Sequence, residues 1–119
     1  MNRRTKGKEY EEYAALFLER KGYCILEHNY YCKVGEVDII ARDGTCIVFV
    51  EVKYRKDDCF GNGFEAVDRR KQRKISDCML QYMTRFQLYD EAFRFDVVSI
   101  LGSRISLIKD AFPFYYNGY

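Results

Sequence analysis

The stretch GEVDIIARDGTCIVFVEVK, residues 35–53, constrains the fold more than any other part of the chain. Two runs of mostly apolar, β-branched residues flank Asp43-Gly44, and an Asp-Gly pair between such runs predicts a β-hairpin. The two runs also carry four charged residues: Glu36, Asp38, Glu51 and Lys53. Charged side chains are seldom buried unless they are paired, so strands that otherwise suit a core need a reason to keep them.

The register of this hairpin predicts where the charged side chains point. A two-residue turn at Asp43-Gly44 places Glu36 opposite Glu51 and Asp38 opposite Phe49. Because side chains alternate along a strand, the four charged residues then share one face of the hairpin. The opposite face carries the β-branched residues Val37, Ile39, Val48, Val50 and Val52.

Opposed carboxylates repel each other, and a divalent cation would relieve that repulsion. Mg²⁺ takes oxygen ligands and often binds through only one or two carboxylates, with water completing the shell. A lysine beside such a metal can orient the attacking water or stabilise charge on a phosphate. Asp38, Glu51 and Lys53 therefore predict phosphodiester hydrolysis that depends on Mg²⁺ or Mn²⁺. The alternative is a half-exposed hairpin on which Glu51 and Lys53 form a surface ion pair.

Hydrophobic periodicity and turn residues predict the other elements. Helices are expected at residues 5–21 and 64–86, and strands at 23–31, 36–42, 45–54, 93–101 and 104–108. The order α-β-β-β-α-β-β predicts an α/β fold with a central mixed sheet flanked by helices. The 119 residues fit one domain, 1–119. The sequence leaves open whether the aromatic tail AFPFYYNGY packs back on the domain or contacts a partner.

Positive charge is concentrated in two places, although the net charge is only +2. The chain begins with Arg3, Arg4, Lys6 and Lys8, and RRKQRK fills positions 69–74. Such clusters are typical of a nucleic-acid footprint; the alternative is a solvated helix face. Neither a signal peptide nor a membrane-spanning run is recognisable, which predicts a cytoplasmic protein with no membrane partner.

Cysteine usage predicts a reducing environment. The five cysteines stand at positions 24, 32, 46, 59 and 78. An odd count without CxxC spacing argues against a disulfide framework and against a zinc site, so most of them are expected to act as small buried hydrophobes.

Two further positions have a predicted placement. Asp96 lies between Phe95 and Val97 in an apolar strand, so it needs a buried partner, which we expect to be an arginine. Lys71 precedes Ile75 by one helical turn and points to the packed side of its helix, where it can reach the site or a phosphate, or lie along the apolar face.

In the first helix, Glu9 and Glu11 flank the apolar stripe about equally, and spacing alone does not choose between them as a site residue. Either acid could instead be there because the helix dipole favours it.

Several motifs occur together in a family-like order: KGKEYEEYAALFLERKGY, GEVDIIARDG, VFVEVKYR, RKQRK and RFDVVSI. In this order they resemble the YraN-like family of small, uncharacterised bacterial proteins. Asp38, Glu51 and Lys53 also resemble the D…ExK motif of the PD-(D/E)xK nuclease superfamily. The resemblance implies a restriction-endonuclease-like fold, similar to archaeal Holliday junction resolvases.

The resemblance implies a role for each matching residue. Asp38 and Glu51 would hold the metal together with the backbone carbonyl of Val52, and Lys53 would assist the attacking water. Glu11 matches a helix glutamate that completes the metal site through water. One departure is visible: Tyr10 stands where the family usually has a small residue, often glycine. We expect Glu36 either to support the metal ligands or to stabilise the nearby turn.

These observations predict a Mg²⁺- or Mn²⁺-dependent endonuclease that selects DNA by structure, branched DNA included, rather than by sequence. Cutting two strands would favour a homodimer. Six basic residues are expected to contact nucleic acid: Arg55, Arg69, Arg70, Lys71, Arg73 and Lys74. Two alternatives remain: a non-catalytic nucleic-acid-binding module of a repair or uptake complex, and a protein-interaction domain that uses its tyrosines and aromatic tail.

Overall fold

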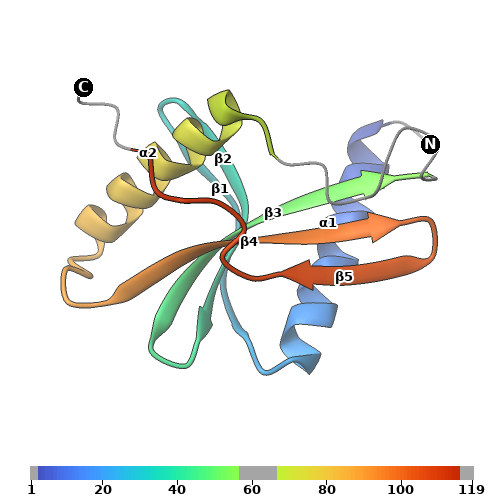
Figure 1. The fold of residues 1–119 in the computed structure, drawn as a ribbon, viewed down its shortest axis with the longest axis horizontal. Helices are drawn as coiled ribbons and strands as arrows, with labels where there is room; N and C mark the ends of the chain where they lie inside the picture. The colour runs from blue at the N-terminus through green and yellow to red at the C-terminus, as the bar shows by residue number, and fades with distance from the viewer. Residues whose placement is uncertain (1–2, 57–66, 116–119) are drawn as a thin grey trace.

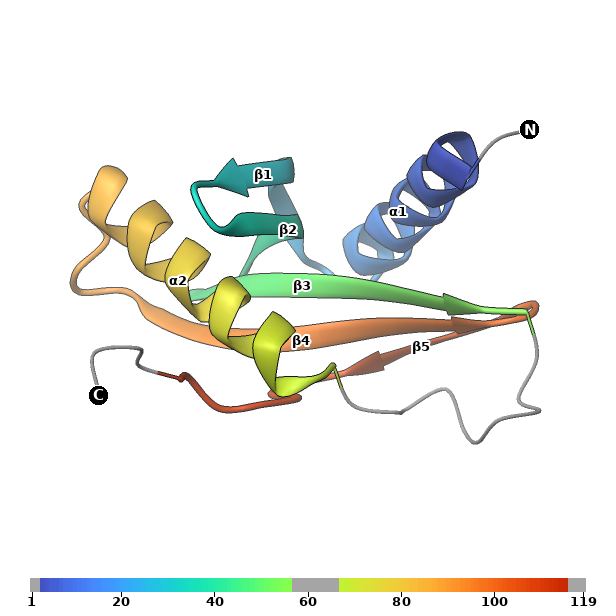
Figure 2. The ribbon, with the colours of Figure 1, turned by 90° about the horizontal axis from the view of Figure 1, so that it is seen from above.

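A computed structural model describes residues 3–56 and 67–115, with only the backbone described for residues 3–6. The elements follow one another as α1 (Arg3–Arg20), β1 (Cys24–Cys32), β2 (Gly35–Asp43), β3 (Cys46–Arg55), α2 (Arg69–Arg85), β4 (Ala92–Leu101) and β5 (Arg104–Ile108). This order confirms the predicted α-β-β-β-α-β-β arrangement. Figures 1 and 2 together show α2 crossing one side of the sheet and α1 lying on the other.

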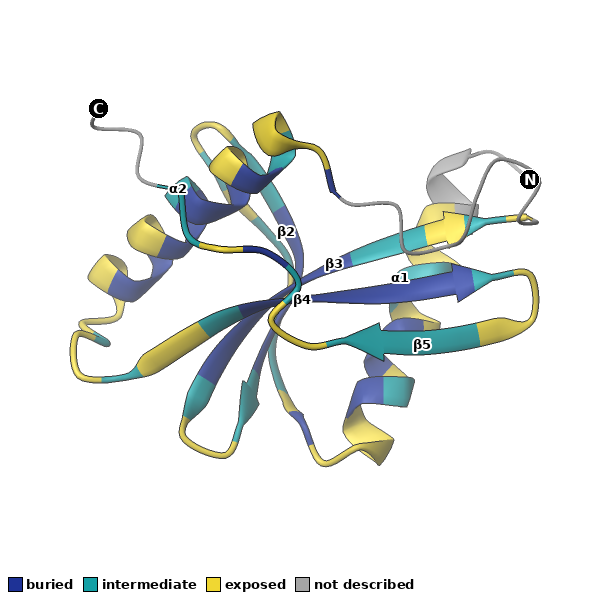
Figure 3. Ribbon diagram, in the orientation of Figure 1, coloured by how far each residue is buried: buried dark blue, intermediate teal, exposed yellow. Residues whose placement is uncertain are grey.

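The five strands form one mixed sheet in the order β1-β2-β3-β4-β5, in which β3 and β4 are parallel and the other neighbours are antiparallel. The core has two parts, one on each face of the sheet. Phe49 and Phe95 pack under α2, whereas Val48 and Val50 pack against α1. The middle strands are therefore buried on both faces, as Figure 3 shows. Within the described residues, neither helix is long and apolar enough to cross a membrane.

The turn between β2 and β3 differs from the predicted one. Asp43 pairs with Cys46, so Gly44 and Thr45 form the two-residue loop, and Gly44 adopts a φ of +61°, which suits glycine. The predicted register is wrong by one residue on each strand. Since the two shifts add up to an even number, Asp38, Glu51 and Lys53 still share a face. Continuing the register one pair beyond Ile39–Val50 matches Asp38 with Glu51.

The strands β2 and β3 separate beyond the Ile39–Val50 pair. Their ladder ends at Ile39–Val50; from there β2 pairs with β1, and β3 pairs with β4. We call this point the fork, and Figure 1 shows β2 running up beneath α2 while β3 runs to the side. The separation explains two errors of prediction. Val37 packs on the α2 side instead of beside Ile39, and Glu36 pairs with Tyr31 of β1 instead of lying opposite Glu51.

Helix α2 begins later than predicted. Asp68 is its N-cap, and its side chain accepts a hydrogen bond of 2.9 Å from the backbone N–H of Lys71. Val67 and Asp68 therefore precede the helix, and residues 64–66 lie outside the described residues. The cap fixes the first turn, which carries Arg69, Arg70 and Lys71.

The described part of the tail, residues 111–115, packs back on the domain. The Phe112 ring stacks on Phe95 with centroids 4.9 Å apart, and the Tyr115 backbone N–H donates a 3.1 Å hydrogen bond to Ser76 Oγ in α2. The sequence left open whether the aromatic tail packs on the domain, and for residues 111–115 it does. Positions 116–119 lie outside the described part.

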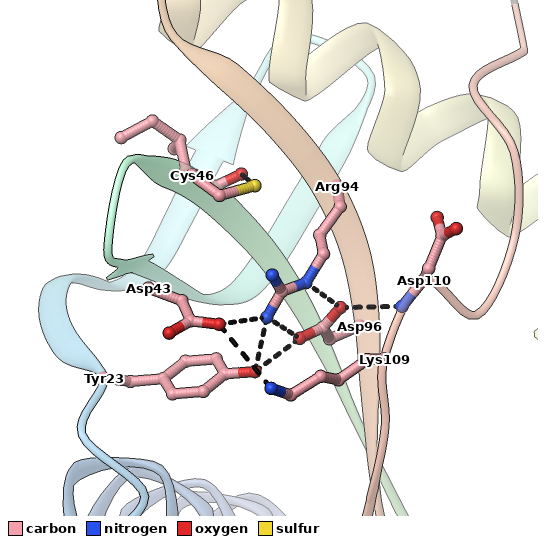
Figure 4. Close-up of polar contacts among 8 residues, drawn as sticks. Tyr23, Asp43, Cys46, Arg94, Asp96, Lys109 and Asp110 are labelled. Carbon is pink, nitrogen blue, oxygen red and sulfur yellow. Dashed lines mark hydrogen bonds and ion pairs between the residues drawn. The ribbon is translucent and has the colours of Figure 1, made fainter.

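A buried ionic network joins elements at the end of the sheet away from the fork (Figure 4). Asp96 is fully buried and accepts a 2.9 Å hydrogen bond from Arg94 Nε, which confirms the predicted arginine partner. The Tyr23 hydroxyl and the backbone N–H of Asp110 also donate to this carboxylate, at 2.9 and 3.0 Å. Arg94 further contacts Asp43 at 2.7 Å. The network thus ties together the segment after α1, the β2–β3 turn, β4 and the end of β5.

Removing Asp96 should be costly because Arg94 would lose its buried partner. We expect Asp96→Ala to lower the free energy of unfolding by about 3–5 kcal/mol. Tyr23→Phe removes one hydrogen bond to the carboxylate and should cost about 1–3 kcal/mol. Urea titrations of both variants check this order. A loss for Asp96→Ala no larger than that for Tyr23→Phe would contradict the importance of the ion pair.

Cys32 and Cys78 form a disulfide between the last residue of β1 and the middle of α2, with their Cα atoms 5.6 Å apart. The expectation that most cysteines act as small buried hydrophobes is therefore wrong, because an odd cysteine count without CxxC spacing argues against a disulfide framework but does not exclude one bridged pair. Cys24 is exposed and Cys46 half-buried, and both are unpaired within the described residues; Cys59 lies outside them.

The disulfide should stabilise the protein by constraining the unfolded chain. It joins residues 46 positions apart, and closing a loop of that length is worth about 4 kcal/mol. We expect Cys32→Ser to lower the free energy of unfolding by about that amount, measured by urea titration under oxidising conditions. Cys24→Ser is the matched control, with little expected effect. Equal stability of oxidised wild type and Cys32→Ser would contradict the bond.

A candidate metal centre at the fork between β2 and β3

Two buried carboxylates mark the fork. Asp38 on β2 is 7% exposed and Glu51 on β3 is 9% exposed. The backbone N–H of Val52 donates a 2.8 Å hydrogen bond to Asp38 Oδ2. The Asp38 side chain therefore takes the position of a strand partner where the β2–β3 ladder ends, which satisfies a backbone donor that the fork would otherwise leave unpaired.

Burial and mutual repulsion make the ionised forms of these acids costly. Burial, followed by the negative charge of Asp38, raises the pKa of Glu51 to about 8, against the opposing effect of Lys71 and Lys53. Burial also raises the pKa of Asp38, although the Val52 N–H and the Lys71 charge act against it. The buried Oε2 atoms of Glu51 and Glu36 find no hydrogen-bond partner among the described residues.

Helix α1 contributes Glu11. This side chain is half-buried, whereas Glu9 is exposed, so the structure brings Glu11 to the acids and resolves the choice between the two. Burial and the charge of Asp38 raise the pKa of Glu11 to about 7. A side-chain hydrogen bond between the two carboxyl groups acts to raise the pKa of Glu11 and to lower that of Asp38.

Asn29 on β1 is a site residue that the sequence analysis missed. It lies across from Asp38, between the pairs His28–Ile39 and Tyr30–Val37, and its side-chain hydrogen bond lowers the pKa of Glu11. Its φ is +50°, an uncommon conformation for a residue other than glycine and one often found at functional sites. The sequence offered one sign of this residue: asparagine is uncommon in the middle of a strand. It tolerates a positive φ and suits turns better than strands.

Tyr10 and Tyr54 stack next to the site, with ring centroids 3.7 Å apart and an angle of 15° between the planes. A hydrogen bond with Tyr54 raises the pKa of Tyr10 to about 12. The stack joins α1 to β3 at the residues next to Glu11 and Lys53. The large residue at position 10 thus turns towards Tyr54 and leaves Glu11 at the acids.

Two lysines approach the carboxylates from different elements. Lys71 on α2 has its Nζ 3.8 Å from Glu51 Oε1, which confirms that its side chain points to the packed side of the helix. Lys53, two residues after Glu51 on β3, is half-buried, and its charge acts to lower the pKa of Glu51. Arg55 follows on the same strand and is also half-buried.

The other basic residues of α2 face solvent. Arg69, Arg70, Arg73 and Lys74 are all exposed. We refer to these four residues as the basic face of α2. At the N-terminus Lys8 is exposed, and the predicted phosphate contacts of Arg3, Arg4 and Lys6 lie outside the described side chains.

The acids fit a hard divalent cation with few protein ligands. Among the described residues, no group of three or more His, Cys, Asp or Glu side chains is arranged to hold a metal ion. Asp38 and Glu51 are nevertheless two buried oxygen donors, and one Glu51 oxygen has no partner. Mg²⁺ commonly binds through one or two carboxylates with water and carbonyl oxygens completing its shell. The donor set therefore suits Mg²⁺ or Mn²⁺ better than a metal that prefers sulfur or nitrogen.

The structure thus defines a class: a small α/β domain with a buried acidic pair and adjacent lysines at a fork in its sheet. Residues 10–100 match the model of the uncharacterised protein family UPF0102, and the chain belongs to that family. This confirms the YraN-like resemblance.

Relatives named UPF0102 protein cover nearly the whole chain. One from Syntrophus aciditrophicus is 51% identical over 98% of this chain and 94% of its own length. Another, from Fusobacterium nucleatum, is 46% identical over 92% of each chain, and one from Lachnoclostridium phytofermentans is 43% identical over 97% of this chain and 98% of its own. These names assign no activity.

The acidic pair predicts that the metal-free protein loses stability as pH rises. A folded Glu51 with a pKa of about 8 keeps a proton that the unfolded chain, with a pKa near 4.5, releases. Between those two pH values the loss should reach up to about 1.4 kcal/mol per pH unit. Urea titrations in EDTA across this range measure it.

Glu51→Gln should flatten this pH dependence and be more stable than wild type at the alkaline end, because glutamine carries no charge. The matched control is Glu19→Gln at an exposed position of α1, which should keep the wild-type slope. A wild-type protein whose stability rises steadily from acid to alkaline pH would contradict the prediction.

Proposed function

We propose that this protein is a Mg²⁺- or Mn²⁺-dependent endonuclease that hydrolyses phosphodiester bonds in DNA and selects its substrate by structure. The observation that carries the proposal is the pair of buried carboxylates, Asp38 and Glu51, at a fork where folding alone gains little from placing them together. Lys53 follows Glu51 by two residues, as in the D…ExK motif, and supports the same assignment.

Each residue of the site would have a separate role. Asp38 and Glu51 would hold the cation together with the Val52 carbonyl, and Glu11 would support it through water. When bound, the cation would supply a polarised phosphate and a more acidic water. Lys53 would orient the attacking water and offset negative charge on the phosphate. Glu36 is half-buried and near the acids, and its negative charge would help to raise the pKa of Glu51.

The basic face of α2, with Lys71 and Arg55, would bind the phosphate backbone. Phosphate contacts of this kind position a nucleic acid without reading its bases, which is why we propose selection by structure. The same fold and motif support placement in the restriction-endonuclease-like PD-(D/E)xK superfamily. Incision of both strands of a junction would require two copies of the domain.

A cleavage assay tests the activity. Labelled single-stranded, duplex, flap and four-way-junction DNA would be incubated with Mg²⁺ or Mn²⁺. We expect wild type to cut at least one substrate, and Glu51→Gln and Lys53→Ala to lower the rate by at least about a hundredfold. EDTA should abolish cutting, whereas Glu19→Gln should leave it unchanged. Absence of cutting on every substrate would contradict a self-sufficient DNA nuclease.

A second candidate function is a nucleic-acid-binding module without turnover, favoured by the exposed basic face of α2. Salt dependence distinguishes it. Each phosphate contact adds about 0.9 to the slope of log affinity against log salt on duplex DNA. Salt-sensitive binding without metal-dependent cutting would favour this module over the enzyme.

A further inference from the structure

Lys71 pairs with the same acid that we propose as a metal ligand. Its Nζ lies 3.8 Å from Glu51 Oε1, and no other cation is this close to Glu51 among the ion pairs of the described residues. The Lys71 side chain is 35% exposed, whereas that of Glu51 is 11% exposed. The ammonium group therefore reaches into the fork from a position that remains open to solvent.

The backbone of Lys71 is fixed although its side chain is long. The Lys71 N–H donates to the Asp68 carboxylate at the cap of α2, and the Cys32–Cys78 disulfide attaches this helix to β1. Movement of the ammonium group thus requires only rotation of the lysine side chain. The exposed basic face of α2 lies on the same helix turns.

A divalent cation and the Lys71 ammonium would compete for one carboxylate. Asp38 and Glu51 are the residues that would hold Mg²⁺ or Mn²⁺, and the Lys71 ammonium already lies 3.8 Å from a Glu51 oxygen. A second cation held by the same carboxylate would repel that ammonium strongly in a partly buried site. Without the metal, the ammonium is the group that balances the buried acids.

We infer that Lys71 occupies the place of the metal in the metal-free protein and, once a cation binds, turns outward to a phosphate of the nucleic acid. The inference rests on the proposed metal-dependent function and adds a coupling to it. Metal binding would release one more positive charge to the basic face of α2, so that the cation and the nucleic acid bind cooperatively.

Mn²⁺ titration of the purified protein, followed by electron paramagnetic resonance, tests the competition directly. We expect Lys71→Met to bind Mn²⁺ about three- to fivefold more tightly than wild type, because the ion pair no longer opposes the metal. Lys74→Met is the matched control: it removes the same charge from the exposed face of α2 and should change Mn²⁺ affinity by less than about twofold.

Thermal unfolding gives a second readout that needs no activity. In EDTA, Lys71→Met should melt below wild type because its buried acids lack a counter-charge, and saturating Mn²⁺ should raise its melting temperature by more than that of wild type or Lys74→Met.

Affinity for a duplex oligonucleotide in Ca²⁺ tests the coupling. The metal-dependent gain in affinity seen for wild type should be smaller for Lys71→Met. Lys33→Met, at an exposed position outside the proposed binding residues, is the control for this assay and should keep the wild-type gain.

Weaker or equal Mn²⁺ binding by Lys71→Met would overturn the inference and leave the proposed nuclease untouched. Absence of Mn²⁺ binding by wild type and by Lys71→Met would remove the metal centre itself, and both proposals with it. Tighter binding by Lys71→Met, with wild-type affinity in Lys74→Met, would support the exchange.

Discussion

The hydrogen bond from the Val52 backbone N–H to Asp38 Oδ2 is the contact on which the rest of the site depends. A sheet that divides leaves backbone groups unpaired where its strands separate, and buried backbone donors need a partner. Asp38 supplies that partner, so the acid is both part of the sheet and part of the site. Removing its carboxylate would therefore disturb the fork as well as the chemistry, which makes Glu51 the cleaner position for functional tests.

The two ends of the sheet use charge differently. At the end of the β2–β3 turn, Asp96 has a partner for each oxygen, and Arg94 and Tyr23 satisfy it within the core. At the fork, Glu51 and Asp38 repel each other, and one Glu51 oxygen has no partner among the described residues. A fully paired network stabilises a fold, whereas buried acids that repel each other and leave an oxygen unpaired are costly to keep. This contrast assigns a structural role to the first group and supports a ligand-binding role for the second.

The order of elements, the mixed sheet and the shared face of Asp38 and Glu51 could be predicted because they follow from periodicity, which tolerates small errors of register. The turn was placed one residue early on each strand, yet Asp38 and Glu51 stayed on one face since the error was even. Asn29 and the Cys32–Cys78 bond could not be predicted, because each depends on two segments that meet only in the folded chain. The start of α2 was missed because the Asp68 cap decides it locally.

The sequence by itself determined which strands carry the acids and that they would face the same way, since alternation along a strand is a property of local backbone geometry. It also determined that Asp96, inside an apolar strand, would need a buried partner, which the structure identifies as Arg94. Only the tertiary structure decided that Asp38 and Glu51 come together at the fork, that Glu11 rather than Glu9 reaches them, and that Lys71 is the cation paired with Glu51. Those choices depend on how two helices cross a sheet that divides, and packing across such distances is not encoded in any single segment.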